Sequence, residues 1–269
     1  MTARASSAAP ARTRALAAAV ATFAADARAG MPGALHDLRV ACRRLEVALR
    51  LWSRRRPALA ARRRVRALRQ AAGPARELEV VAEALRLRRS GAGVIPGALR
   101  KRWLAALRRR PVGTGDIHLP GEHTVRAFTA ETEQAASTLE SERTPVIVKR
   151  ATARRQAWRR RAEQRLAHGL GSGDVEALHR ARLAIKRWRY AEELLAAAPD
   201  RSPAVVPELR RWQRVLGELN DRALLVAFAA AQGPRGQACA RRLEVLRLEA
   251  LRRLRATRGA SGAAPRPQA

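Results

Sequence analysis

The chain has 269 residues, of which 55 are lysine or arginine and 23 are aspartate or glutamate, so its formal charge at pH 7 is +32. A compact body with this charge repels itself and needs anions around it, which favours nucleic acid, anionic lipid or polyphosphate as the partner. Hydrophobic residues make up 47% of the chain, and no window of about 18 uncharged apolar residues occurs. We therefore expect a folded core and no membrane span.

Apolar residues recur at intervals of three and four along the whole chain, and no sustained alternation indicates a strand. The sequence therefore predicts an all-α protein. The first predicted helix starts in a basic, apolar segment, but Asp26 and Arg28 interrupt that segment, so we expect a helix and not a signal peptide. With breaks placed at proline and glycine, the predicted helices cover residues 11–29, 33–54, 57–72, 74–89, 96–109, 122–141, 145–168, 174–198, 203–216, 218–231 and 235–257.

The stretch RRRPVGTGDIHLPGEH at 108–123 is the clearest linker, and it lies near the middle of the chain. His118 and His123 lie in it without cysteine or carboxylate at ligand spacing, so we expect no metal site there. The first few residues and the tail should be disordered. The predicted organisation is a single domain at 10–257, with a first half at about 10–110, a linker at about 110–121, a second half at about 122–257 and a tail at 258–269.

Two cysteines, Cys42 and Cys239, have no metal-type spacing and indicate no disulfide framework. We expect both to be small core residues in a reducing compartment.

Two motifs occur twice, in the same order. LHDLRVACRRLEVALRLW (35–52) is followed 143 residues later by LHRARLAIKRWRYAEELL (178–195). AAGPARELEVVAEAL (71–85) is similarly matched by VLGELNDRALLVAFA (215–229), at an offset of 144. Two motifs at nearly the same offset indicate a duplication, and a repeat of this length is too long for a solenoid unit. We therefore predict two pseudo-symmetric helical bundles.

Helical spacing of about 100° per residue places His36, Arg39, Arg43 and Arg50 on one stripe, opposite an apolar stripe that includes Leu38. A basic stripe is by default a solvated face. Its repetition favours a binding site, because two such stripes brought together would repel one another unless an anion filled the cavity between them. The second motif repeats the partition, with His179, Arg182 and Lys186 on the stripe, Arg189 and Tyr190 beside it, and Arg44 and Arg187 at matching flanks.

LHDLRVACRRLE and LHRARLAIKRWRY resemble the two signature helices of CHAD domains, the conserved-histidine α-helical domains. AGPARELEVV and LGELNDRALL resemble the other paired motif of that family, and the resemblance extends from about residue 10 to 257. It implies two pseudo-symmetric helical bundles around a central basic cavity or pore that binds inorganic polyphosphate. Many members are joined to a CYTH domain, which processes triphosphates through an acidic β-tunnel. Nothing in this sequence resembles such a tunnel, so we expect a stand-alone member.

The resemblance and phosphate chemistry together assign the site, because arginine forks match phosphate oxygens. The family often has a cation ten residues after the histidine, as Arg189 provides in the second half, whereas the first half has Glu46. We expect Glu46 to pair with Arg43 or Arg50 on its own helix, and we expect Asn220 and Asp221 to fix helix-to-helix geometry. The predicted polyphosphate-binding residues are His36, Arg39, Arg43, Arg44, Arg50, Arg66, His179, Arg182, Lys186, Arg187, Arg189 and Arg210.

No catalytic motif, cofactor motif or paired-carboxylate site occurs in the sequence, which favours a binding module over an enzyme. The alternative is a nucleic-acid binder, for which the arginine runs at 54–56, 62–64, 108–110 and 159–161 would suit phosphate backbones. Low aromatic content, 3%, argues against base stacking. A third hypothesis is an adaptor in the cytoplasm, recruited to polyphosphate granules together with a polyphosphate-metabolising protein partner.

Overall fold

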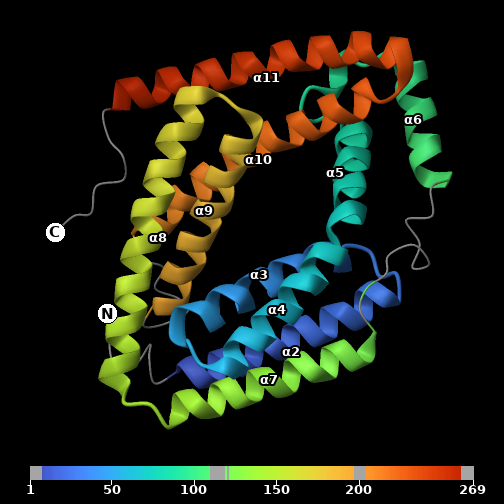
Figure 1. The fold of residues 1–269 in the computed structure, drawn as a ribbon. Helices are drawn as coiled ribbons and strands as arrows, with labels where there is room; N and C mark the ends of the chain where they lie inside the picture. Colours follow the sequence, from blue (N-terminus) through green and yellow to red (C-terminus); the bar gives the residue numbers. More distant parts are fainter. Residues whose placement is uncertain (1–7, 110–118, 120, 197–203, 262–269) are drawn as a thin grey trace. The chain divides into compact units, whose positions relative to one another are not determined.

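The computed structural model describes residues 8–109, 119, 121–196 and 204–261. All regular structure within these ranges is helical, which confirms the predicted all-α class (Figure 1). The elements are α2 (Ala9–Arg28), α3 (Ala34–Trp52), α4 (Arg56–Ala71), α5 (Gly73–Leu87), the 3-10 helix η1 (Ala92–Val94), α6 (Gly97–Arg109), α7 (Glu122–Glu140), α8 (Thr144–Ser172), α9 (Val175–Leu195), α10 (Val205–Ala230) and α11 (Gly233–Ser261).

The helices form two compact units. Unit 1 comprises Met1–Arg76, Pro111–Trp158 and Arg187–Pro203, and unit 2 comprises Glu77–Arg110, Arg159–Lys186 and Ala204–Ala269. Helices α5, α8 and α9 begin in one unit and end in the other. Each unit therefore takes segments from both of the halves that the sequence repeat defines.

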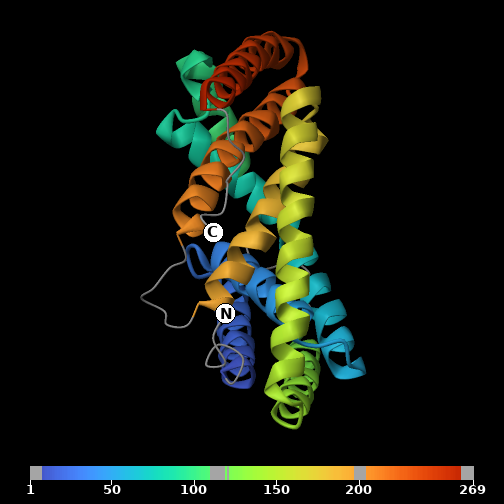
Figure 2. The ribbon, with the colours of Figure 1, turned by 90° about the vertical axis from the view of Figure 1, so that its left-hand side faces the viewer.

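In unit 1, α2 and α4 each pack against both α3 and α7, and these four helices lie side by side in Figures 1 and 2. Their core contains the apolar stripe predicted for α3, since Leu38, Cys42, Leu45 and Leu49 are at most 1% exposed. Burial of this stripe fixes the rotation of α3 about its own axis. The basic stripe on the other side of the helix is thereby directed away from the core.

In unit 2, α10 and α11 run along each other, as both ribbon views show (Figures 1 and 2). Their shared core also takes in η1 and α6. Trp103 of α6 meets Phe228 of α10 edge to face, with ring centroids 5.6 Å apart. This arrangement is a favourable one for aromatic rings, so it secures α6 against α10.

The predicted break at Gly217 is wrong. Residues 203–216 and 218–231 were expected to be separate helices, but α10 continues from Val205 to Ala230. Glycine inside a helix costs only about 1 kcal/mol relative to alanine, and the apolar pattern on both sides outweighs that cost. At the equivalent Gly73, by contrast, a break does occur, because α4 ends at Ala71 and α5 starts at Gly73.

The predicted linker and the predicted disordered termini lie mostly outside the described residues. The predicted linker at about 110–121 contains only two described residues, 119 and 121, and His118 is not among them. The first few residues and 262–269 are likewise outside the described ranges, while α11 continues to Ser261, four residues into the predicted tail.

Replacing Gly217 with alanine should raise the free energy of unfolding by about 0.5–1 kcal/mol. An added Cβ would lie 3.7 Å from Nε of Arg182, an ordinary contact, while the helix would lose its most flexible residue. Chemical denaturation followed by circular dichroism measures the change.

The matched control is Gly236→Ala in α11, where the added Cβ would collide with the carbonyl oxygen of Ala229. That variant should lower the free energy of unfolding. A destabilising effect of Gly217→Ala of the same size as that of Gly236→Ala would contradict the close but unstrained packing of α10 at Gly217.

Candidate anion-binding site

Helix α3 presents the first basic stripe. The helix begins after Gly33, which adopts the left-handed conformation with φ of 79°. Along the side opposite the core, His36 is exposed, whereas Arg39, Arg43 and Arg50 are half-buried. Half-buried guanidinium groups keep their charge and lose some of their water, which strengthens their attraction for an anion.

Arg39 is held in place by the junction between α4 and α5. Its Nη1 atom donates a hydrogen bond to the carbonyl oxygen of Arg69, at 2.9 Å. The same atom lies 3.2 Å from the position that a Cβ on Gly73 would take. With a Cβ at this position, the end of the Arg39 side chain would have to shift by a few tenths of an ångström. Glycine at this place in the second motif therefore gives the Arg39 guanidinium its close approach.

Glu46 pairs with Arg69 of α4, whose Nε atom lies 2.6 Å from its Oε1. The sequence analysis had predicted a partner for Glu46 on the same helix, either Arg43 or Arg50. The neighbouring helix supplies a nearer cation, because α3 and α4 pack along each other. Glu46 thus neutralises Arg69, and its negative charge partly offsets the lowering of the Arg62 pKa that burial and Arg50 cause.

Four arginines of unit 1 form a cluster, which we call the arginine cluster: Arg50 of α3, Arg62 and Arg66 of α4, and Arg154 of α8. Burial lowers the pKa of Arg62, and the nearby charges of Arg50 and Arg66 lower it further. Burial lowers the pKa of Arg154 to about 10, and repulsion from nearby arginines, among them Arg50 and Arg62, adds to this shift. The cluster is therefore a place where like charges are crowded in a partly desolvated space.

Arg154 also satisfies the end of α3. Its Nη1 atom donates to the carbonyl oxygen of Arg50, to that of Leu51 at 3.0 Å and to that of Ser53 at 3.2 Å. These are carbonyl groups that a helix leaves without partners at its C-terminus. The same contacts bring the Arg154 charge beside Arg50, so one side chain both ends the helix and enlarges the cluster. The sequence analysis did not identify Arg154. Its spacing of one helical turn from Arg150 would have placed the two arginines on the same side of α8.

Arg44 and Arg189 have carboxylate and aromatic partners within unit 1. Glu193 pairs with Arg189 at 2.7 Å and with Arg44 at 3.5 Å. The guanidinium carbons of Arg189 and Arg44 also lie 4.4 and 5.5 Å from the ring centroid of Tyr190. Arg189 is only 8% exposed. Arg44 therefore connects α3 to the end of α9, whereas the contacts of Arg189 lie within α9. Arg187 is half-buried on that same segment of α9.

In unit 2, α9 presents His179, Arg182 and Lys186, all half-buried. Nδ1 of His179 lies 2.7 Å from Oδ1 of Asn220 on α10. An amide oxygen accepts only, so Nδ1 carries the hydrogen and Nε2 is left for another partner. This contact confirms the prediction that Asn220 fixes the geometry between two helices. Arg210 is exposed on the same helix as Asn220.

Arg182 lies against Gly217. A Cβ on Gly217 would be 3.7 Å from Nε of Arg182 and 3.8 Å from its Nη2. In each unit, therefore, the arginine three residues after the histidine packs on the glycine of the second motif. The predicted site residues divide into a unit 1 group of His36, Arg39, Arg43, Arg44, Arg50, Arg66, Arg187 and Arg189 and a unit 2 group of His179, Arg182, Lys186 and Arg210.

Within the described ranges, no group of three or more histidine, cysteine, aspartate or glutamate side chains is placed to hold a metal ion. Cys42 and Cys239 are buried thiols, as predicted. Burial, followed by the nearby Glu46, raises the pKa of Cys42 to about 12, so that thiol stays protonated. None of the described helices combines the length and the apolar character that crossing a bilayer requires.

Comparison with known proteins decides the family. The family model of the CHAD domain matches residues 11–230. The chain belongs to the CHAD domain family. The crystal structure of the CHAD domain from the plant Ricinus communis has a similar fold, with a TM-score of 0.65 and 22% sequence identity over 98% of this chain and 93% of that chain. Among curated proteins, none matches the chain.

Replacing Arg62 with glutamine should raise the free energy of unfolding by about 0.5 kcal/mol at low salt, because it relieves repulsion within the arginine cluster. The gain should shrink near 1 M salt, where the Debye length falls to about 3 Å. Denaturation at several salt concentrations measures both effects.

Arg63→Gln on the exposed side of α4 is the matched control and should change stability little at any salt concentration. Destabilisation by Arg62→Gln at low salt would show that favourable contacts of Arg62 outweigh the repulsion.

Proposed function

We propose that this CHAD domain binds inorganic polyphosphate through the basic stripes of α3 and α9, and that it acts as a targeting or accessory module without catalytic activity of its own. The observation that carries the proposal is the matched contact of Arg39 with Gly73 and of Arg182 with Gly217. A solvated helix face needs no cation that packs at a fixed place on a neighbouring helix. Two such contacts, at corresponding places in the repeat, favour a function for the held guanidinium groups.

The arrangement of the held arginines suits a chain of phosphates. Each guanidinium group offers parallel N–H donors that match two phosphate oxygens, and such charge-assisted pairs are among the stronger hydrogen bonds in proteins. Arg39 is already oriented by its hydrogen bond to the carbonyl of Arg69. A group that is oriented beforehand loses less side-chain freedom when the anion binds. Lys186 adds a point charge, and Nε2 of His179 is a donor whenever the imidazole is protonated.

The crowding of the arginine cluster supports the same function. Burial and then repulsion lower the pKa of Arg62 and of Arg154, and a polyanion beside the cluster would replace that repulsion with attraction. We therefore add Arg62 and Arg154 to the proposed site. We also propose that the repeat is a pseudo-symmetric duplication around a central basic cavity, for which the support is the pair of sequence motifs.

A nucleic-acid binder is the second candidate, favoured by the exposed side chains of Arg63 and Arg64 on α4 and of Arg160 and Arg161 on α8. Such surfaces attract any phosphate backbone. However, Trp103 and Trp158 are 3% and 5% exposed, so they pack in cores and offer no platform for stacked bases. Polyphosphate needs no such platform. We propose a cytoplasmic location, with recruitment to polyphosphate granules and a polyphosphate-metabolising protein as partner.

Replacing Arg39 and Arg182 together with lysine should weaken polyphosphate binding by roughly tenfold or more, because lysine keeps the charge but lacks the fork that grips two oxygens. Replacing the same pair with glutamine should abolish measurable binding, since charge-assisted contacts are worth about 1.5–3 kcal/mol each. Calorimetric titration with polyphosphate of defined length measures both, and circular dichroism checks that helical content is unchanged.

Arg63→Gln combined with Arg241→Gln is the control, because it removes the same charge from exposed positions on α4 and α11. Its affinity should stay within about twofold of the original. If the lysine pair binds as tightly as the original protein, or if the control loses as much affinity as the glutamine pair, diffuse charge explains the binding and the proposed site is wrong.

A further inference from the structure

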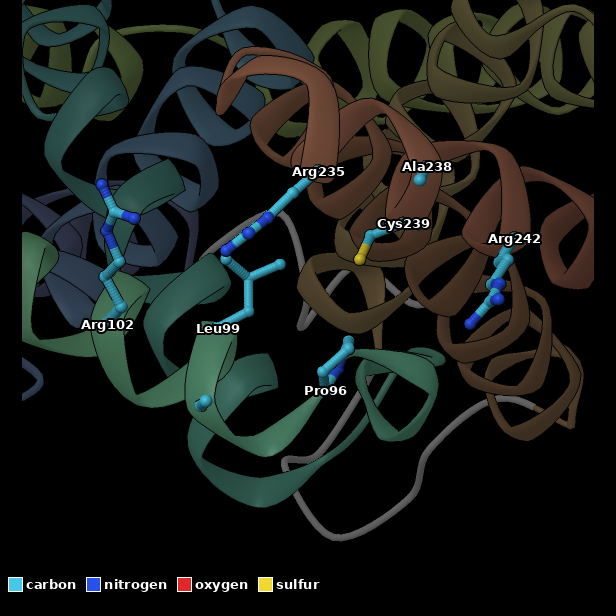
Figure 3. Close-up of a pocket in the computed structure, with 8 residues that line it drawn as sticks. Pro96, Leu99, Arg102, Arg235, Ala238, Cys239 and Arg242 are labelled. Carbon is cyan, nitrogen blue, oxygen red and sulfur yellow. The ribbon is translucent and has the colours of Figure 1, made fainter.

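A pocket of about 420 Å³ lies in unit 2, and none of the residues of the proposed polyphosphate site lines it (Figure 3). Its walls come from α6 with the residues just before it, and from the first turns of α11. Pro96, Ala98 and Leu99 line it on the α6 side, and Ala238 and Cys239 line it on the α11 side. A volume of this size is within the range that small-molecule sites occupy.

Helical periodicity explains why α11 forms one wall. Arg235, Ala238, Cys239 and Arg242 are separated by three, one and three residues, which places them on one side of a helix. The small side chains of Ala238 and Cys239 leave the hollow between the two arginines. Behind this wall lies the unit 2 core, which includes Cys239 and Leu243.

Three arginines, Arg102 on α6 and Arg235 and Arg242 on α11, complete the lining, and all three are exposed residues (Figure 3). No acidic residue is among the described residues that line the pocket. An apolar floor with positive charge around it differs from the polyphosphate stripes, where the half-buried arginines offer little apolar surface. Its chemistry fits a ligand that has both an apolar body and an anionic group.

We propose that this pocket binds a small organic anion, with the apolar body against Pro96, Leu99 and Ala238 and with the anionic group beside one of the arginines at the rim, Arg102, Arg235 or Arg242. Apolar burial supplies most of the affinity, because exposed ion pairs contribute little. The guanidinium groups supply the preference for a negative charge. Inorganic polyphosphate lacks the apolar body, so this site selects a different class of ligand from the proposed function.

Anilinonaphthalene sulfonate tests the proposal, because its fluorescence rises on an apolar site and it carries one anionic group. Near 150 mM salt, the dye should bind the full chain. Ala238→Phe, which fills the hollow, should weaken binding about tenfold or more. Arg235→Gln combined with Arg242→Gln should weaken it about three- to tenfold. N-phenylnaphthylamine, the same ring system without the sulfonate, should bind more weakly than the dye.

The matched control is Arg241→Gln combined with Arg252→Gln, which removes the same charge from exposed positions on α11 outside the pocket. The control should bind the dye as the original protein does, and so should the Arg39 and Arg182 variants. Failure of the dye to bind would overturn the proposal, as would equal binding by Ala238→Phe, an equal loss in the control or equal binding of the neutral compound. Binding that changes with protein concentration would identify a second copy of the chain as the occupant and would also overturn it.

Discussion

Repulsion among arginine side chains is the constraint on which the arrangement of unit 1 depends. Arg50, Arg62, Arg66 and Arg154 come from three helices, and their mutual repulsion adds to burial in lowering the pKa of Arg62 and of Arg154. The fold tolerates this crowding because particular contacts hold some of the cations in place. Arg154 donates to the last carbonyl groups of α3, and Glu46 neutralises Arg69 beside the cluster. An anion from outside the chain would stabilise the positive charge that remains.

The basic stripes and the buried cores depend on each other. Leu38, Cys42, Leu45 and Leu49 fix the rotation of α3 by entering the core of unit 1, and this rotation directs Arg39 and Arg43 toward the other side. Arg44 and Arg189 use their charge differently, since both engage Glu193 and Tyr190. Cations of one motif therefore have two roles. Arg44 connects α3 to α9, whereas Arg39 and Arg43 belong to the stripe for which we propose a ligand.

Sequence alone predicted the helical class and the phase of α3, because a strong 3.6-residue period extends over the whole of the motif. It failed where the outcome depends on neighbouring helices. Glu46 meets Arg69 instead of a cation on its own helix, and Arg154 reaches α3 from α8. Pairings of this kind depend on how helices cross, which single-helix spacing does not contain. At Gly217 the sequence predicted a helix break, because glycine favours turns. The apolar pattern on both sides outweighs that preference, and the helix continues.

Selectivity for a bare phosphate chain over a nucleic acid is the central claim, and a competition measurement tests it most directly. Labelled long-chain polyphosphate, or labelled DNA or RNA, would be bound near 150 mM salt and then challenged with the other ligand, at equal phosphate concentration and in excess. Diffuse surface charge responds to phosphate density alone, whereas oriented guanidinium groups favour the ligand without bulky sugars and bases. The account predicts that polyphosphate displaces nucleic acid and that excess nucleic acid leaves polyphosphate bound. Competition on equal terms per phosphate would contradict it and would favour a general nucleic-acid binder.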